Sequence, residues 1–260
     1  MKTHNPEAST GPAQPWYSLT RTAHDLINIT EPHVHPTLQA NIWWLQGEQD
    51  IVIDAGLGVV PLKASVPELF SRNPLLVLTH AHLDHSGGAH EFDDIAIHKN
   101  EAPSLERPLQ ASLETSELYP ALGLPYTEET SKHVMLSKLP STHYQLGSYR
   151  LLGSKPTRLL KHGDTITTAT HELQVLATPG HSPGSICLLD RVNKRLYTGD
   201  VIYEGNLLDQ IAGASRSDYL QTMEQLLQLD FELAMPGHGT PLTRRQVEDI
   251  ATSYLSLHGA

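Results

Sequence analysis

The sequence has little that would support disulfide bonds, membrane insertion or nucleic-acid binding. Its one cysteine, Cys187, cannot form an internal disulfide bond and lies in an apolar run typical of a buried strand. No apolar run approaches the roughly 18 residues of a membrane-spanning helix, and the first residues lack the apolar core of a secretion signal. The formal net charge of −11 argues against the basic groove that binds nucleic acid. We therefore expect a cytoplasmic protein with no membrane span and no nucleic-acid partner.

The length and the hydrophobic content of 39% fit a single α/β domain with a sizeable core. Residues 1–20 are rich in Pro, Gly, Ser and Thr, which predicts a flexible N-terminal tail. No interior linker divides the remainder, so residues 21–260 are interpreted as one domain.

Strands are predicted where short apolar or alternating segments end at turn residues. They cover residues 26–30, 41–46, 50–54, 75–79, 95–97, 157–160, 165–168, 172–177, 185–189, 195–198 and 232–235. Helices are predicted over residues 62–71, 217–229, with Ser217 as the N-cap, and 244–257. The alternation of strands and helices in two similar halves favours an α/β fold.

Histidine is unusually frequent, with 16 residues, and five histidines fall in segments that follow apolar strands. Those segments are Thr79-His80-Ala81-His82-Leu83-Asp84-His85, Pro179-Gly180-His181, Gly199-Asp200 and Pro236-Gly237-His238-Gly239. A lone histidine in a loop is usually a surface group, and an H-x-H pair can arise by chance. The ordered set is far more specific. Because ligands collect at strand ends in an open α/β sheet, we expect the segments to converge.

Imidazole nitrogens and carboxylate oxygens are the donors that suit zinc, and catalytic zinc keeps one position for water. Five histidines and two aspartates provide three ligands for each of two ions, with Asp200 shared between them. A hydroxide can then bridge the ions, because zinc lowers the pKa of bound water to about 7. Since iron, manganese and cobalt accept similar ligands, the pattern predicts two divalent cations, with Zn²⁺ favoured.

Other residues near these segments are open to two interpretations. Asp54, at a strand end, either bonds backbone amides or orients a metal-bound histidine, and the second is favoured. Tyr203 is a packed aromatic or, if its hydroxyl faces the metals, a donor to a developing oxyanion. Trp43 and Trp44 alternate along a strand, so we expect one in the core and the other at a pocket.

The remaining histidines are expected at the surface or in support of the ligands. They are His4, His24, His33, His35, His90, His133, His143, His162, His171 and His258. His98, which follows a strand, is expected to serve packing.

At these residues the sequence resembles the metallo-β-lactamase superfamily, from about Ile42 to the last helix. The resemblance implies a four-layer αββα sandwich with the site along one edge. It also implies the metal ligands: His80, His82 and His181 for the first metal, Asp84, His85 and His238 for the second, and Asp200 as the bridge. Asp84, Asp200 and Tyr203 are then the candidate catalytic residues.

The ligand set also separates branches of that superfamily. Its true β-lactamases lack the bridging aspartate, and its iron flavoproteins carry Glu where this chain has His82. The set is similar to that of glyoxalase II, lactonases, thioesterases and nucleases. The segments Ala40-Asn41-Ile42-Trp43 and Gly199-Asp200-Val201-Ile202-Tyr203 resemble acyl-coenzyme A thioesterases, whereas the Asp-x-x-Tyr spacing is also similar to N-acyl-homoserine lactonases.

The function implied is hydrolysis of a small acyl thioester or lactone by a metal-bridging hydroxide. Residues 100–160, in which prolines interrupt weak helical patterns, are expected to be an insertion that shapes the substrate site. The alternatives are an N-acyl-homoserine lactonase, a catalytically weak metal-bearing sensor and, against the net charge, a nuclease. The sequence leaves a monomer and a homodimer equally open.

Overall fold

The computed structural model describes residues 15–259, so residues 1–14 of the predicted tail lie outside the described chain. The C-terminal boundary predicted for that tail, residue 20, is wrong. Trp16 and Tyr17 are buried, and strand β1 (Ser18–Ala23) begins directly after them. Trp16 and Tyr17 pack into the core, although the segment around them is polar in composition.

The first sheet contains seven strands in the order of the chain, and the bounds of the last six agree closely with predicted strands. Its strands from β1 to β4 are antiparallel, and those from β4 to β7 are parallel. After β1 they are β2 (Leu26–Thr30), β3 (Ile42–Leu45), β4 (Ile51–Ile53), β5 (Leu75–Leu78), β6 (Asp94–His98) and β7 (Arg158–Leu160).

The second sheet has six strands in the order β13-β12-β11-β10-β9-β8, and only β11 and β12 pair in parallel. Its strands are β8 (Thr165–Thr167), β9 (Glu172–Ala177), β10 (Ile186–Asp190), β11 (Arg195–Gly199), β12 (Leu233–Pro236) and β13 (Leu242–Thr243). Cys187 lies buried in β10, as its apolar neighbours indicate. Strands β1 and β13 were not predicted, because β1 is exposed and polar and β13 has two residues.

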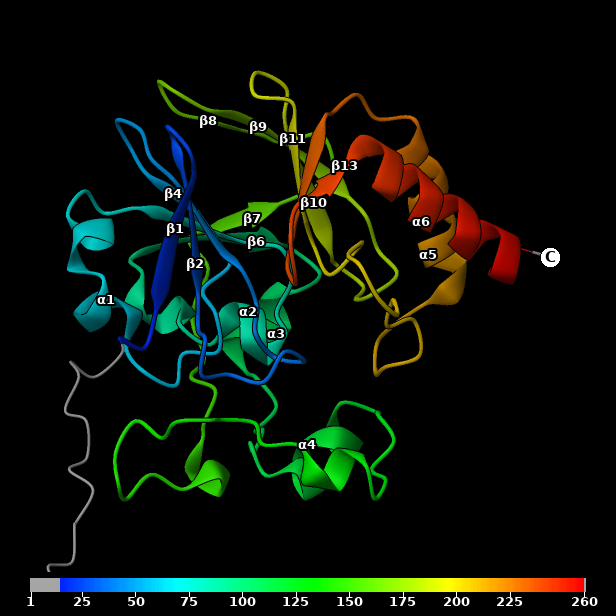
Figure 1. Cartoon of the computed structure of the whole chain (residues 1–260). Coiled ribbons are helices and arrows are strands. Elements are labelled where there is room, and N and C mark those ends of the chain that lie inside the picture. The colour runs from blue at the N-terminus through cyan, green and yellow to red at the C-terminus, as the bar shows by residue number, and fades with distance from the viewer. Residues whose placement is uncertain (1–14, 260) are drawn as a thin grey trace, which may run out of the picture.

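Helices cover the outer faces of the two sheets, so the fold has the four layers expected (Figure 1). Helices α5 (Arg216–Leu227) and α6 (Arg244–His258) pack side by side on the second sheet. Ser215, not Ser217, is the N-cap of α5, because its side chain accepts the Asp218 N–H. None of the helices in residues 15–259 is long and apolar enough to cross a membrane.

The helix predicted over residues 62–71 is divided in two. Helix α1 (Leu62–Ser65) ends before Pro67, and a 3₁₀ turn, η1 (Pro67–Phe70), follows it. The proline ring disfavours the helical conformation of the residue before it, which explains the break at Val66. The prediction for Trp43 and Trp44 is also wrong in part: both are buried, Trp43 between the sheets and Trp44 on the outer face of the first sheet.

Residues 100–160 carry short elements between β6 and β7, and most of them form the lower lobe of Figure 1. Their buried apolar side chains join the core on the outer face of the first sheet. The elements are α3 (Ala102–Glu106), α4 (Thr115–Ala121), η3 (Thr130–Lys132) and η4 (Leu146–Ser148). Two short elements outside this range, α2 (Leu83–Ser86) and η2 (Ala89–Glu91), follow β5.

Candidate metal centre

The predicted ligands meet where the two sheets present strand ends to one another. The segment His80–His85 follows β5 of the first sheet, whereas His181, Asp200 and His238 follow β9, β11 and β12 of the second. Backbone hydrogen bonds join these segments: the Ile186 N–H donates to the Thr79 carbonyl at 3.0 Å, and the Gly237 N–H donates to the Gly199 carbonyl at 2.7 Å.

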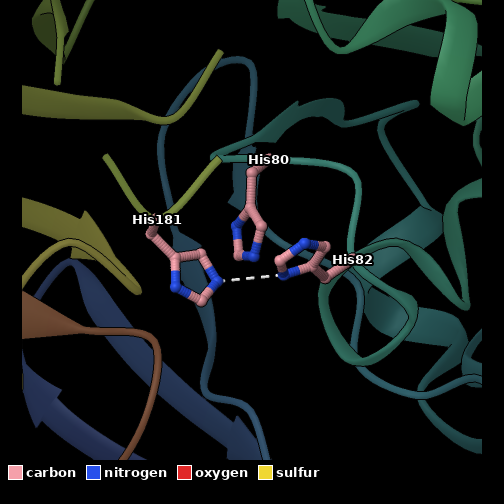
Figure 2. A group of neighbouring side chains, drawn as sticks. All are labelled: His80, His82 and His181. Carbon is pink, nitrogen blue, oxygen red and sulfur yellow. Dashed lines mark hydrogen bonds between the residues drawn. The ribbon is translucent and has the colours of Figure 1, made fainter. Parts of the chain in front are cut away.

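Three histidines form the first ligand group, namely His80, His82 and His181. Figure 2 shows their rings pointing toward one another from two separate loops. The His181 Nε2 lies 2.9 Å from the His82 Nδ1, and the buried His80 Nε2 has no hydrogen-bond partner. One donor atom from each ring lies within 4.8 Å of the other two.

The second ligand group consists of Asp84, His85 and His238. The His238 Nε2 lies 3.2 Å from the Asp84 Oδ2, and the His85 Nε2 lies 3.6 Å from the same oxygen. One donor atom from each of the three residues lies within 4.8 Å of the others, so this group matches the first in compactness.

Asp200 lies between the two groups and faces both. Its Oδ1 is 3.1 Å from the His85 Nε2 and 3.4 Å from the His238 Nε2. Its Oδ2 is 3.5 Å from the His181 Nε2. A carboxylate with one oxygen toward each group has the geometry of a shared ligand.

Four of the five ligand histidines turn one nitrogen inward and bind the protein with the other. The outer Nδ1 atoms of His80 and His85 contact the Thr79 hydroxyl at 3.1 Å and the Asp54 carboxylate at 2.8 Å. Those of His181 and His238 contact the carbonyls of Leu208 at 3.3 Å and Gln39 at 3.1 Å. Metal-ligating histidines characteristically have such outer partners, which fix the ring and leave the inner nitrogen unprotonated.

Electrostatics keep the imidazoles of the first ligand group neutral and the carboxylates anionic, whereas the carboxylates raise the pKa of the two histidines of the second group. Burial lowers the pKa of His181 to about 4 and holds that of His80 well below its usual value. Burial opposes ionisation of Asp200, but His238 and His85 outweigh it and hold the pKa of Asp200 well below its ordinary range. Burial would also lower the pKa of His238, yet Asp200 and Asp84 raise it to about 10. The carboxylates therefore require positive charge beside them.

These residues fit divalent cations. Three buried inward-facing atoms, the His80 Nε2, the His85 Nε2 and the Asp200 Oδ1, have no hydrogen-bond partner of good geometry. Donors about 2.0–2.1 Å from a tetrahedral ion lie about 3.3 Å from one another, and the nitrogen–oxygen separations above run from 3.1 to 3.6 Å. Nitrogen and oxygen donors at that spacing suit a metal ion better than mutual hydrogen bonding.

Asp54 has the orienting role favoured by its position in the sequence. Besides His85, its carboxylate accepts the Thr79 N–H at 2.8 Å and the Thr79 hydroxyl at 2.8 Å. Its backbone has a φ of 62°, a conformation that non-glycine residues seldom adopt. Asp54 therefore supports the second ligand group directly, and the Thr79 hydroxyl extends that support to His80.

Gly237 is required by the close approach of the loop that carries His238. A Cβ atom at this position would lie 2.5 Å from the Asp200 Oδ1 and 2.7 Å from the His85 Cε1. Asn41 holds the same loop, because its side-chain amide donates to the carbonyls of Pro236 and Gly239.

A cavity of about 420 Å³ opens directly over the ligands. Its floor includes His82, Asp84, His181, Asp200 and His238. Its walls come from three segments: residues 36–38, Leu122 and Leu124 of the insertion, and the loop of residues 203–211. The apolar residues of these walls are Pro36, Leu38, Leu122, Leu124, Leu208 and Ile211.

Tyr203 lies in the cavity wall, with its ring 5.9 Å from that of His238. Its hydroxyl donates to the Asn206 carbonyl at 2.9 Å within its own loop. Burial, together with Asp200, raises the pKa of the hydroxyl, so the group is a neutral donor.

The other described histidines lie outside the ligand set. His98 is buried, and its Nδ1 accepts the Asn100 N–H at 3.4 Å. His171 is also buried, and its Nε2 meets the Gln46 carbonyl at 3.1 Å, so the expectation of a surface or ligand-supporting role is wrong for it. His35 and His133 stack with ring centroids 4.6 Å apart. His4 lies outside the described residues.

Two buried carboxylates near the site were missed by the sequence analysis. Glu101 accepts hydrogen bonds from the loops that carry His80, His82 and His181. Glu31 accepts the indole N–H of Trp16 and the Leu57 N–H. Glu101 lies four residues after the strand predicted over residues 95–97, and that position is the one signal that could have identified it.

A two-sheet sandwich with histidines and aspartates clustered at one edge is the arrangement of a metal-dependent hydrolase. The chain belongs to the metallo-beta-lactamase superfamily, which it matches over residues 35–238, and it is a hydrolase of that superfamily that binds divalent metal.

Among curated proteins, the chain is similar to acyl-coenzyme A thioesterase MBLAC2 of Homo sapiens. The two are 35% identical over 265 residues, which cover 94% of this chain and 88% of the relative. The Bos taurus protein of the same name is 34% identical with the same coverage. Among solved structures, BLEG-1 B3 metallo-beta-lactamase has a TM-score of 0.60 and 25% identity, covering 84% of this chain and 94% of that one.

Proposed function

We propose that the chain hydrolyses an acyl thioester, with acyl-coenzyme A as the leading substrate, and that two Zn²⁺ ions occupy the two ligand groups. The observation that carries the proposal is the cavity: His82, Asp84 and Asp200 form part of its floor, and its walls are largely apolar. Apolar walls suit an acyl chain, because burying each methylene contributes about 0.8 kcal/mol. The similarity to acyl-coenzyme A thioesterases over 94% of the chain supports the same substrate class.

The ligands have distinct tasks in this reaction. When bound, the cations supply an ionised water near neutral pH and offset negative charge on the substrate carbonyl oxygen. Asp200 fixes the two ligand groups relative to one another, since its two oxygens face different groups. Asp84 keeps the second group anionic, and the apolar walls direct the acyl carbonyl toward the floor and exclude water beside it.

Tyr203 is proposed to assist at the carbonyl oxygen. Its ring stands in the wall beside His238, and its hydroxyl needs only to exchange the Asn206 carbonyl for the substrate oxygen. Preorganised donors of this kind stabilise the oxyanion of acyl transfer. Tyr203→Phe should then lower kcat while metal content stays unchanged, and an unaltered kcat would remove Tyr203 from the mechanism.

A second candidate is hydrolysis of an N-acyl-homoserine lactone. The placement of Tyr203 three residues after Asp200, with both in the cavity, favours it. The attack on an acyl carbonyl is the same in both reactions, and the leaving group differs: a thiolate from the thioester and an alkoxide from the lactone.

The test is a substrate panel with purified protein of known metal content. Acyl-coenzyme A esters, N-acyl-homoserine lactones and a β-lactam are compared before and after chelation, with elemental analysis of zinc, iron, manganese and cobalt. We expect the highest kcat/KM for acyl-coenzyme A, its loss on chelation and its return with Zn²⁺. Full activity after complete removal of metal would overturn the proposal, and metal binding without turnover would favour a sensor. The cytoplasmic location stays a prediction.

A further inference from the structure

Glu101 is a buried carboxylate that the reaction proposed above does not use. It lies at the N-cap position of α3 and is 3% exposed. Within residues 15–259 it has no ion pair with a lysine or arginine at 4.0 Å or less. A carboxylate removed from water is unfavourable unless hydrogen bonds replace its hydration, so its partners indicate what it does.

Those partners belong to the two loops that carry the first ligand group. The Glu101 Oε2 accepts the Ala81 N–H at 3.0 Å, and Ala81 lies between the ligands His80 and His82. The Glu101 Oε1 accepts the Ser182 hydroxyl at 2.9 Å and the Gly184 N–H at 2.8 Å. Ser182 directly follows the ligand His181, so one carboxylate binds both loops.

The fit around the carboxylate is close. A Cβ atom on Gly184 would lie 2.7 Å from the Glu101 Cγ, so only glycine leaves room for the side chain there. The Ser182 hydroxyl also contacts the Ser185 hydroxyl at 2.7 Å, which holds it in reach of Glu101. Three donors from the two loops converge on one carboxylate, so these contacts define the position of each loop.

We propose that Glu101 is a positioning residue for the first metal: it sets the separation between the His80–His82 loop and the His181 loop. The three imidazoles in Figure 2 come from these two loops, and a shift of either would move a ring away from the other two. Glu101 contacts no imidazole in this role and acts through the main chain and Ser182. The inference depends on the metal sites of the proposed function but not on the identity of the substrate.

The test compares Glu101→Gln with Glu106→Gln, which removes an exposed carboxylate of the same helix. The glutamine amide keeps the shape of Glu101 but presents N–H groups to one of the loops, so at least one donor loses its acceptor. Apoprotein is titrated with Zn²⁺ against a chromophoric chelator, which gives the affinity of each site without any substrate.

We expect the wild type and Glu106→Gln to bind two ions with equal affinities. Glu101→Gln should weaken one site about 10–100-fold and leave the other within a factor of about two. Circular dichroism and thermal unfolding of the apoproteins separate this effect from loss of fold. A purely structural role would lower the unfolding temperature while the affinity of both sites stayed at the wild-type value, and that result would overturn the proposal.

Ser182→Ala provides an independent test in case the Glu101 variant does not fold. It removes one of the three hydrogen bonds and should weaken the same site by a smaller factor, whereas unchanged affinity in this variant would also overturn the proposal. A wild type that binds a single ion contradicts the proposal of two cations; Glu101 is then upheld or refuted by whether its variant weakens that ion. A wild type that binds no ion overturns both.

Discussion

The two ligand groups are supported in different ways. The first group consists of three imidazoles, and Glu101 holds the loops that carry them. The second group contains its own carboxylate, Asp84. Asp54 orients the His85 ring of this group by direct contact. On the proposed role of Glu101, the first site depends mainly on the spacing of two chain segments, with Thr79 linking Asp54 to His80, whereas the second depends on the orientation of single side chains.

Under the proposal that each group holds one cation, this difference predicts that the two cations respond separately to mutation. Asp200 is the exception, because it faces both groups. We therefore expect effects on metal binding and activity that decrease in order. The largest follows loss of the shared ligand Asp200, a smaller one follows loss of a ligand that belongs to one group only (a private ligand), and the smallest follows loss of a supporting carboxylate.

The largest effect is expected for Asp200→Ala. Loss of the shared carboxylate should reduce Zn²⁺ content at both sites and lower kcat/KM by about a thousandfold or more, since bound cations contribute several kcal/mol to transition-state stabilisation. Elemental analysis and steady-state kinetics measure both effects. Asp230→Ala, which removes an exposed aspartate that pairs with Lys194, is the matched control. Retention of two ions in Asp200→Ala would show that the groups are held without a bridge.

His181→Ala and His238→Ala should each remove one private ligand. Each variant is expected to bind one ion with near wild-type affinity and the other much more weakly, because His181 and His238 each belong to one ligand group only. Mass spectrometry under non-denaturing conditions counts the ions in each. If either variant lost both ions together, the two sites would be cooperative and the comparison of separate groups would be wrong.

Asp54→Asn should have a smaller effect at the second site. The asparagine amide cannot accept from both the His85 Nδ1–H and the Thr79 groups, so we expect about 10–100-fold weaker Zn²⁺ binding at one site. The double variant Asp54→Asn with Glu101→Gln sharpens the comparison. If the two carboxylates support different sites, both affinities should fall by the single-variant factors. Weakening of the same site in both single variants would contradict this assignment.

Glu31→Gln should have the smallest effect on the rate and a clear effect on the pH dependence of stability. Burial raises the pKa of Glu31 from its ordinary 4.5 to about 7, although hydrogen bonds from Trp16 and Leu57 oppose the shift. Between those values the folded protein binds a proton that the unfolded chain has released. The free energy of unfolding therefore falls as the pH rises, by about 2 kcal/mol between pH 5 and pH 7.

The Glu31→Gln variant should lack that fall, which urea unfolding of the apoprotein at several pH values can measure. Glu68→Gln, at an exposed position of η1, is the control and should keep the wild-type slope. Glu31 accepts the N–H of Leu57, which belongs to the loop that follows Asp54, and Asp54 contacts the second ligand group. An identical pH slope in wild type and Glu31→Gln would mean that the carboxylate is ionised throughout.

The ligand set and most strands were predictable because their signals are local. The order H-x-H-x-D-H after an apolar strand indicates a metal site from six consecutive residues. The structure brings the histidines and the aspartate of this motif together with His181, Asp200 and His238. Strands such as β5 and β9 are marked by their own apolar runs.

The supporting contacts were less predictable because they depend on long-range packing. Glu101 meets Ser182 across 81 positions of sequence, and only its place shortly after a strand distinguishes it locally from the exposed Glu106. Trp43 and Trp44 alternate as expected for a strand, but the helix layer buries the face that was expected to border a pocket. Trp16 and Tyr17 were assigned to a tail because their neighbours are polar.

The walls of the cavity differ in their freedom to change. On the 203–211 loop, Leu208 lines the cavity and its carbonyl also contacts the His181 Nδ1, so remodelling that wall would disturb a ligand. Leu122 and Leu124, by contrast, make no hydrogen bond to a metal ligand within residues 15–259. Substrate range can therefore evolve on the insertion side at little risk to metal retention, and selection for new acyl groups should act there first.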